Sequence, residues 1–226
     1  MTDAPVRRSG DAYVELGPAL LDAAASGAVG LAATVVAPAA LVLGSAQDAT
    51  EATTALDVVR RGTGGGAVLC DAGTLLVDLA VPAGHPLAPA DVTEAYRPLG
   101  ETLQAALAGI GIACRAVAVA EARAMDDARR AAARRACWAG ISPYETVLAD
   151  GRKVAGLAQR RRRGAVLHQL AVPVTTRPGD VALHLVDGAS LVPHLAAVAS
   201  LADAGWQGAP DDLWTALADP LRALAG

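Results

Sequence analysis

A dense run of glycines restricts the fold of this chain more than any other feature of its sequence. The run is entered from two arginines, reads Arg-Arg-Gly-Thr-Gly-Gly-Gly over 60–66, and leaves through an apolar stretch that ends before Asp71. Glycines this close together let a backbone pass near a bound group with its N–H donors free, and paired arginines suit a carboxylate or a phosphate. The run therefore predicts a ligand-binding loop between two strands.

Two well-known phosphate loops can be tested against this run. Residues 62–67 formally fit the G-x-G-x-x-G/A pattern of dinucleotide-binding folds. A Rossmann loop must open a helix, however, and residues 67–81 have the pattern of strands, with Gly73 in their middle. A Walker loop is excluded as well, because no Gly-Lys-Ser/Thr closes the run. A tight β-turn without a ligand is the remaining alternative for this segment taken alone.

Apolar runs bounded by turn residues predict the other elements. An Asp-Gly turn at 150–151 is a strong signal, because this dipeptide favours hairpins. Asp126 and Arg130 have the spacing that supports a helix over 121–136, with a solvated insert as the alternative. Strands are expected at 31–36, 40–43, 55–60, 67–70, 74–81, 112–119, 144–148, 153–158, 164–174 and 181–186. Helices are expected at 18–26, 91–108, 189–204 and 210–224.

Hairpin strands with helices before, between and after them indicate an α+β fold, a mixed and largely antiparallel β-sheet flanked by helices. The 226 residues fit a single domain over 1–226, and a hydrophobic content of 53% suffices for a sizeable core. The net charge of −4 argues against a nucleic-acid partner, because phosphate neutralisation needs a broad basic face.

The N-terminal residues and the cysteines indicate the compartment. No apolar segment near the N-terminus resembles a signal peptide, and the longest apolar run, 29–43, is broken by Gly30 and Pro38 and too short to span a bilayer. We therefore expect a cytoplasmic protein without a membrane partner. Three cysteines without a Cys-x-x-Cys pair predict free thiols rather than a disulfide framework.

A second motif, Gly-Arg-Lys-Val-Ala-Gly-x-Ala-Gln over 151–159, follows the glycine run further along the chain. Together the two motifs resemble those of the lipoate–protein ligase and octanoyltransferase family (biotin/lipoate A/B protein ligases), and the resemblance covers about 40–173. It implies a biotin/lipoate ligase-like catalytic domain with a tunnel for a medium-chain acyl group. It also implies transfer of that group to a specific lysine of a small acceptor domain.

The resemblance also implies roles for single residues. Lys153 is the expected essential lysine, contacting the acyl carbonyl and the phosphate, because a positive donor stabilises the oxyanion that forms when an amine attacks. A lysine that points into solvent is the alternative. The residues expected to bind the acyl group or acyl-adenylate are Arg60, Arg61, Thr63, Gly64, Gly65, Gly66, Ala67, Cys70, Asp71, Gly156, Ala158, Gln159 and His168.

The family activates the acyl group by two routes. Ligases use ATP and Mg²⁺ with free lipoate or octanoate, whereas octanoyltransferases need no such cofactor and take the acyl group from an acyl carrier protein through a cysteine. Cys137, in Arg-Ala-Cys-Trp, is similar to the nucleophile of one octanoyltransferase branch. Its alternative is a packing cysteine; Cys114 is expected in the core, and Cys70 ends a strand. Both routes end on lipoyl acceptor domains.

Two departures from the family pattern leave a third alternative open. Cys70 stands where many relatives have a histidine, and His168-Gln169 stands where they often have His-Gly. A shift of one residue in a strand turns a side chain to the opposite face of the sheet. A non-catalytic relative that binds an acyl group or acyl-adenylate is therefore kept as an alternative.

The arginines at 160–163 could dock an acidic partner or form a solvated turn. No histidine has metal-ligand spacing.

Overall fold

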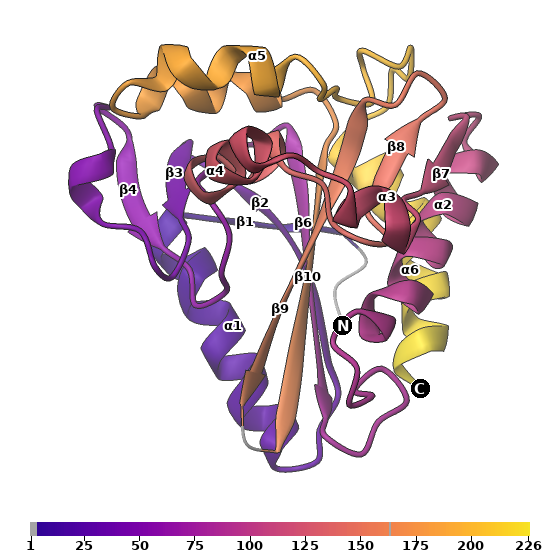
Figure 1. Ribbon diagram of the computed structural model, residues 1–226. Coiled ribbons are helices and arrows are strands. Elements are labelled where there is room, and N and C mark those ends of the chain that lie inside the picture. Colours follow the sequence, from indigo (N-terminus) through magenta and orange to yellow (C-terminus); the bar gives the residue numbers. More distant parts are fainter. Residues whose placement is uncertain (1–3, 163) are drawn as a thin grey trace.

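The fold is built on a seven-stranded sheet in the order β1-β2-β6-β10-β9-β8-β7, seen in a computed structural model that describes residues 4–162 and 164–226 (Figure 1). Strands β1 and β2 are parallel, and every other neighbouring pair is antiparallel. The strands are β1 (Val6–Arg8), β2 (Gly30–Val36), β6 (Thr74–Pro82), β7 (Cys114–Ala116), β8 (Thr146–Leu148), β9 (Lys153–Arg162) and β10 (Ala165–Pro173). The expected mixed, mostly antiparallel sheet is confirmed.

A second, three-stranded sheet lies beside the first and carries the glycine run. Its order is β4-β3-β5, with β3 parallel to β4 and antiparallel to β5. The strands are β3 (Ala40–Leu43), β4 (Asp57–Arg60) and β5 (Val68–Cys70), so the glycines connect β4 to β5. As the sequence predicted, the run leads from one strand into another rather than into a helix.

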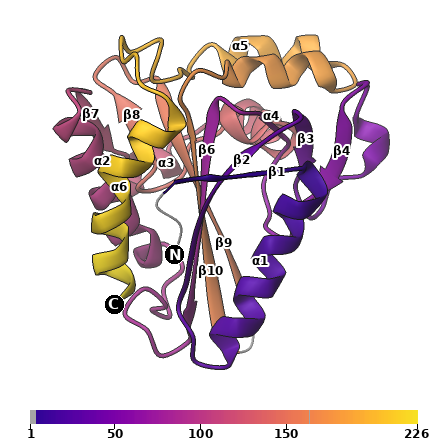
Figure 2. The ribbon, with the colours of Figure 1, turned by 180° about the vertical axis from the view of Figure 1, so that it is seen from behind.

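Helices cover both faces of the large sheet. Helix α1 packs on one face, against β6 and β10, while α2 and α6 pack together on the other (Figures 1 and 2). The α-helices are α1 (Gly10–Ala25), α2 (Arg97–Gly109), α3 (Val119–Arg123), α4 (Asp127–Arg135), α5 (Val192–Leu195) and α6 (Pro210–Ala225). Five 3-10 turns complete the description: Ala49–Glu51, Glu94–Tyr96, Cys137–Ala139, Pro178–His184 and Gly188–Leu191.

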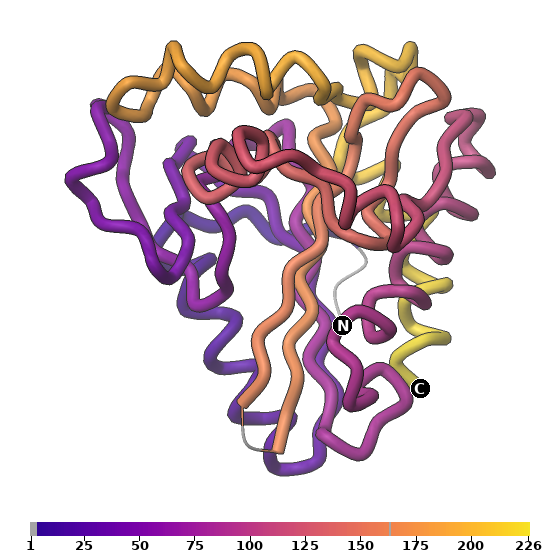
Figure 3. The backbone as a smooth tube through the Cα atoms, viewed as in Figure 1, coloured from indigo at the N-terminus to yellow at the C-terminus, as the bar shows by residue number. Residues whose placement is uncertain are grey.

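The apolar core divides along the sheet because successive side chains of a strand point to opposite faces. On β6, Leu75 and Val77 belong to the core under α2 and α6, whereas Leu76 belongs to the core shared with the small sheet. Figure 3 shows β9 and β10 running side by side along the molecule, consistent with their antiparallel register. The second core surrounds the cavity described below.

Helix α1 begins earlier than the 18–26 predicted, and this affects the site. Ser9 caps its N-terminus by accepting a bond from the Ala12 N–H at 3.3 Å, and Pro18 lies inside the helix rather than in its first turn. A Cβ atom on Gly10 would lie 2.9 Å from the Ala40 Cβ, so α1 packs close to the small sheet. The earlier start places Tyr13 over the sheet.

The C-terminal third departs most from the sequence prediction. The strand predicted at 181–186 is wrong: Pro178–His184 is a 3-10 helix, and the His184 imidazole is hydrogen-bonded to the Thr54 hydroxyl at 2.8 Å. The single helix predicted at 189–204 is also wrong, since only two short helical segments form there. Ser200 and Asp203 exchange side-chain to backbone bonds of 2.9 and 3.1 Å, which favours a turn at that point.

Three central predictions needed smaller corrections. The helix expected over 121–136 forms as α3 and α4, and Asp126 caps α4 through the Arg129 N–H at 2.7 Å instead of pairing with Arg130. The strand expected over 112–119 shortens to β7, and the helix expected over 91–108 becomes a 3-10 turn followed by α2. Among the described residues, no helix combines the length and apolar character needed to cross a membrane.

Candidate active site

A cavity of two adjoining compartments lies where the small sheet meets the edge of β9. The inner compartment has mainly apolar walls that include Val42, Val68, Leu76 and Trp138. The outer compartment is more polar and is lined by the glycine loop, α4 and the start of β9. Three residues, Cys137, Leu157 and Ala158, line both compartments. Cys137 therefore stands where the two meet.

The glycine loop forms one wall of the cavity, and its glycines are required by close packing. Gly65 has a φ of +91°, and a Cβ there would lie 3.6 Å from the Cys137 sulfur. A Cβ on Gly66 would lie 2.5 Å from the Ala136 nitrogen. Among the described residues, nothing accepts a hydrogen bond from the N–H groups of Gly64, Gly65 and Gly66. Of these three glycines, Gly64 and Gly65 line the outer compartment.

The two arginines before the loop point in opposite directions. Arg61 is 7% exposed and donates to the carbonyl oxygens of Val42, Gly64 and Gly66 at 3.2, 2.9 and 2.8 Å. Arg60 instead donates to the Gln47 carbonyl at 3.3 Å and lines a separate hollow on the α1 side. Consecutive strand residues alternate in this way. The structure thus brings Arg61 but not Arg60 to the cavity, and Arg61 holds the loop from inside.

Lys153 lies buried in the wall of the outer compartment, so the alternative of a solvent-pointing lysine is wrong. Its Nζ lies 2.8 Å from the Glu145 carboxylate, and both side chains are 2% exposed. The ammonium also donates to the carbonyl oxygens of Gly140 and Cys137 at 3.2 and 3.4 Å, and it lies 5.3 Å from the centre of the Trp138 ring. These contacts tie Lys153 to the turn that carries Cys137.

Glu145 is a site residue that the sequence reasoning missed. Its carboxylate accepts from the N–H groups of Ser142 and Leu157 at 2.8 and 3.0 Å, in addition to its ion pair with Lys153. The preceding residue, Tyr144, has a φ of +65°, which is uncommon for a residue with a side chain. The available signal was Lys153 itself, because a lysine in an apolar strand needs a buried acid as a partner.

Cys137 is positioned by backbone pairing with the glycine loop. Its N–H donates to the Ala67 carbonyl at 3.0 Å, while the Ala67 N–H donates to the Arg135 carbonyl at 2.9 Å. Cys137 begins a 3-10 turn directly after α4 and is half-buried. Ala67 therefore acts through its backbone, fixing the cysteine beside Gly65 rather than lining the cavity.

The other two cysteines have different surroundings. Cys70 lines the inner compartment, but its burial raises the pKa of the thiol to about 12, which keeps it protonated at neutral pH. Cys114 lies outside the cavity, half-buried, with its sulfur 3.8 Å from the Gln104 carbonyl, and desolvation raises its pKa as well. Of the three thiols, Cys137 alone lines both compartments.

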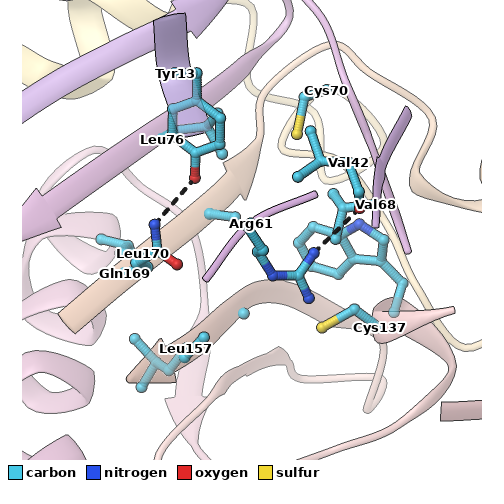
Figure 4. Close-up of a pocket in the computed structure, with 14 residues that line it drawn as sticks. Tyr13, Val42, Arg61, Val68, Cys70, Leu76, Cys137, Leu157, Gln169 and Leu170 are labelled. Carbon is cyan, nitrogen blue, oxygen red and sulfur yellow. Dashed lines mark hydrogen bonds between the residues drawn. The ribbon is translucent and has the colours of Figure 1, made fainter. Parts of the chain in front are cut away.

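A polar clamp, consisting of Tyr13, Thr63, Asp78 and Gln169, interrupts the apolar wall of the inner compartment. The Thr63 hydroxyl donates to the Gln169 side-chain oxygen at 2.6 Å. The Gln169 side-chain nitrogen donates to the Asp78 carboxylate at 2.6 Å and to the Tyr13 hydroxyl at 3.4 Å. Figure 4 shows Gln169 and Tyr13 on one side of this compartment and Cys137 on the other. Burial raises the pKa of Asp78 to about 7.

The structure does not bring His168 to the cavity. It points to the opposite face of β10, where its Nε2 donates to the Leu87 carbonyl at 2.8 Å and its ring meets Tyr96 edge-on. Burial lowers the pKa of this imidazole to about 4. The adjacent Gln169 takes the cavity face instead, which is the one-residue shift that the strand alternation implied.

The remaining predicted residues divide between cavity and scaffold. Gly156 and Ala158 line the inner compartment, and Gln159 lines the outer one while donating to the Val92 carbonyl at 2.9 Å. Asp71 holds a turn instead, through the Gly73 N–H at 2.8 Å and the Thr176 hydroxyl. Arg160 packs against the loop, since a Cβ on Gly62 would lie 1.9 Å from its guanidinium.

Two further points concern metals and the arginine run. Within 4–162 and 164–226, the structure contains no group of three or more His, Cys, Asp or Glu side chains arranged to hold a metal ion. Of the arginine run, Arg162 pairs with Asp22 at 3.1 Å, and the last member, at position 163, lies outside the described residues.

Residues 24–205 match the catalytic-domain model of the lipoyl protein ligase A/B family. The chain belongs to this family. Its relatives include the octanoyltransferases LipM of Brevibacillus brevis and Bacillus subtilis, each 37% identical over 112 residues, or 50% of this chain. The chain spans about 40% of the length of these curated relatives.

Two solved members of the lipoate ligase group share the fold. Lipoate-protein ligase A bound with ATP matches 98% of this chain and 83% of its own, with a TM-score of 0.73 and 20% identity. The bipartite lipoate protein ligase of Thermoplasma acidophilum, described with its E2 lipoyl domain, matches 97% of this chain and 81% of its own, with a TM-score of 0.73 and 18% identity. At these identities the likeness establishes the fold alone.

Proposed function

We propose that this lipoylation-family protein transfers an octanoyl or lipoyl group to a lysine of a lipoyl acceptor domain, through a thioester at Cys137. One observation carries the proposal: Cys137 is the thiol that stands where the apolar and polar compartments meet. The similarity to octanoyltransferases LipM supports the same reaction. In this account the acyl chain occupies the inner compartment and the reacting carbonyl lies beside the glycine loop.

The first step forms the acyl-enzyme. The Cys137 thiolate attacks the thioester carbonyl of an acyl carrier protein, and the carrier leaves as its thiol after taking up a proton. The oxyanion that forms needs donors already in place. The free N–H groups of Gly64, Gly65 and Gly66 suit this role, because Gly65 lies against the Cys137 sulfur.

The second step releases the product. The neutral amine of the acceptor lysine attacks the Cys137 thioester, an amide forms, and the cysteine leaves as a thiol that takes up the proton lost by the amine. Lys153 supports both steps, because its ammonium binds the Cys137 carbonyl oxygen and so brings a positive charge to the turn that carries the reacting cysteine. Glu145 fixes that ammonium in turn.

An ATP-dependent lipoate ligase is the second candidate within the enzyme class. It would join free lipoate or octanoate to AMP, and the free N–H groups of the loop also suit a phosphate. Mg²⁺ would accompany ATP in that reaction. The third candidate binds the acyl group or acyl-adenylate without turnover.

A paired assay separates the three. With octanoyl carrier protein and a lipoyl domain, without ATP, we expect the wild type to octanoylate the domain and Cys137→Ser to be inactive. Cys114→Ser, which changes a thiol outside the cavity, serves as the matched control and retains activity. ATP–pyrophosphate exchange with free lipoate and no transfer from the carrier would establish the ligase instead. Acyl binding without either activity would leave the binding protein.

A further inference from the structure

Gln169 is a long side chain in a part of the cavity wall where its neighbours on β9 and β10 are small. Strand register places Gln169 opposite Ala158 on β9, and Ala171 opposite Gly156. Gly156, Ala158 and Ala171 line the inner compartment with at most a methyl group each, so the Gln169 side chain extends well beyond these neighbours. It lies on the side of the compartment away from Cys137 (Figure 4).

The polar clamp holds this side chain from both ends. Its oxygen accepts from Thr63 and its nitrogen donates to Asp78, each at 2.6 Å. Both partners are 1% exposed, and the Tyr13 hydroxyl lies 3.4 Å from the same nitrogen. Moving Gln169 aside would leave a buried carboxylate and a buried hydroxyl without their partner, which is costly.

The clamp also brings polar groups into the wall of an apolar compartment, through Tyr13 and Gln169. One Asp78 carboxylate oxygen is buried and has no hydrogen-bond partner among the described residues. A hydrocarbon chain cannot hydrogen-bond to such a group. Contact of the chain with Val42, Val68 and Leu76 therefore favours binding, whereas contact with the clamp opposes it.

We propose that Gln169, held by the polar clamp, is the stop that limits the length of the acyl chain. This inference rests on the proposed use of the inner compartment for the acyl chain. Medium chains end before Gln169, whereas longer chains must break the Thr63–Gln169–Asp78 bonds to enter. Gln169 is thus a specificity-determining residue and takes no part in the transfer itself.

The test compares chain lengths rather than absolute rates. Acyl-pantetheine thioesters from hexanoyl to tetradecanoyl serve as donors, and the corresponding free fatty acids serve as ligands in calorimetry. We expect wild-type kcat/KM to peak at octanoyl, and Gln169→Ala to raise the ratio of dodecanoyl to octanoyl by about tenfold or more. Thr63→Val, which removes one bond of the clamp and keeps the side-chain shape, should shift the ratio in the same direction. Gln104→Ala, a glutamine truncation on α2, should leave it unchanged.

The outcomes separate this inference from the proposed function. Absence of acyl transfer, together with a fatty-acid binding preference that lengthens in Gln169→Ala, would refute the transferase and support the stop. If Gln169→Ala does not fold, Thr63→Val decides. An unchanged ratio in the folded variants, in transfer or in binding, overturns the stop. A wild-type protein that neither binds nor transfers any acyl chain also overturns it.

Discussion

Among individual side chains, the buried pair of Lys153 and Glu145 has the largest expected consequences. Two charges that are 2% exposed have lost their hydration, and each depends on the other for compensation. The Glu145 carboxylate also accepts hydrogen bonds from the N–H groups of Ser142 and Leu157, so the pair joins β9 to the segment before β8. Disturbing either charge should therefore affect both stability and chemistry.

Glu145→Gln should lower the free energy of unfolding by about 3–5 kcal/mol, because it leaves the Lys153 ammonium buried without a counter-charge. Glu145→Gln combined with Lys153→Met should recover part of that loss but no acyl transfer. The matched control is Glu121→Gln, which breaks the exposed pair with Arg115 and should cost less than about 1 kcal/mol. Urea denaturation checks these values. A double variant with wild-type transfer would contradict the role of Lys153.

The Asp78 carboxyl group should make the free energy of unfolding depend on pH. Burial raises its pKa to about 7, so the folded protein keeps this proton while an unfolded aspartate releases it near pH 4. The folded state therefore loses stability relative to the unfolded state as the pH rises from about 4 to about 7. Asp78→Asn removes this loss. The variant should gain roughly 2–4 kcal/mol on the wild type between about pH 5 and about pH 8. Urea denaturation of both proteins at about pH 5 and about pH 8 measures this gain. The same stability difference between variant and wild type at the two pH values would contradict the prediction.

Among the structural elements, the glycine loop is held by the Arg61 side chain in addition to the backbone bonds of Thr63 and Ala67 at its two ends. Arg61 joins the carbonyl of Val42 on β3 to those of Gly64 and Gly66 in the loop. A planar guanidinium can reach several acceptors at once, which an ammonium on a flexible stem does less well. Arg61 therefore contributes directly to the order of the glycine loop.

Arg61→Lys should therefore loosen the loop while keeping its charge. We expect faster hydrogen exchange of the Ala67 N–H, which donates to the Arg135 carbonyl at the end of the loop, and a loss of about 1–3 kcal/mol in the free energy of unfolding. Arg60→Lys is the matched control, because Arg60 bonds Gln47 on the other side of β4 and should leave exchange in the loop unchanged. Equal effects of the two substitutions would show that the loop does not depend on Arg61.

Sequence patterns predicted the elements whose signals are local. The strand at 40–43 and the hairpin around Gly151 were found because apolar runs and an Asp-Gly turn define them, and Gly151 has the φ of +86° that such a turn needs. The segment 181–186 misled because its apolar residues alternate as in a strand, while its observed partner, Thr54, is distant in the chain. The early start of α1 depends on the Ser9 cap, which accepts from the Ala12 N–H.

The site shows the same division. The motifs pointed to Lys153, Gly64, Gly65 and Cys137, which the fold brings to one cavity. Glu145 could not be assigned, because its role depends on how the segment before β8 packs against β9. Tyr13 depends on the close approach of α1 to the sheet. These contacts are set by tertiary packing, and no short motif records them.

At the level of the complete fold, the cavity exists because two sheets meet beside an open strand edge. β8 pairs with only the first residues of β9, so the later part of β9 faces the glycine loop and α4. Segments far apart in sequence, the loop after β4, the turn after α4 and the start of β9, converge there (Figure 1). A single covalent intermediate at that junction would account for the arrangement.

The most direct measurement is the mass of the protein after a single turnover with an octanoyl thioester and no acceptor, followed by peptide mapping. We expect one octanoyl adduct, located on Cys137, released by a lipoyl domain and absent in Cys137→Ser. Cys70 and Cys114 should stay unmodified, since burial raises the pKa of both thiols. An adduct on Cys70, or efficient octanoyl transfer by Cys137→Ser, would contradict the account.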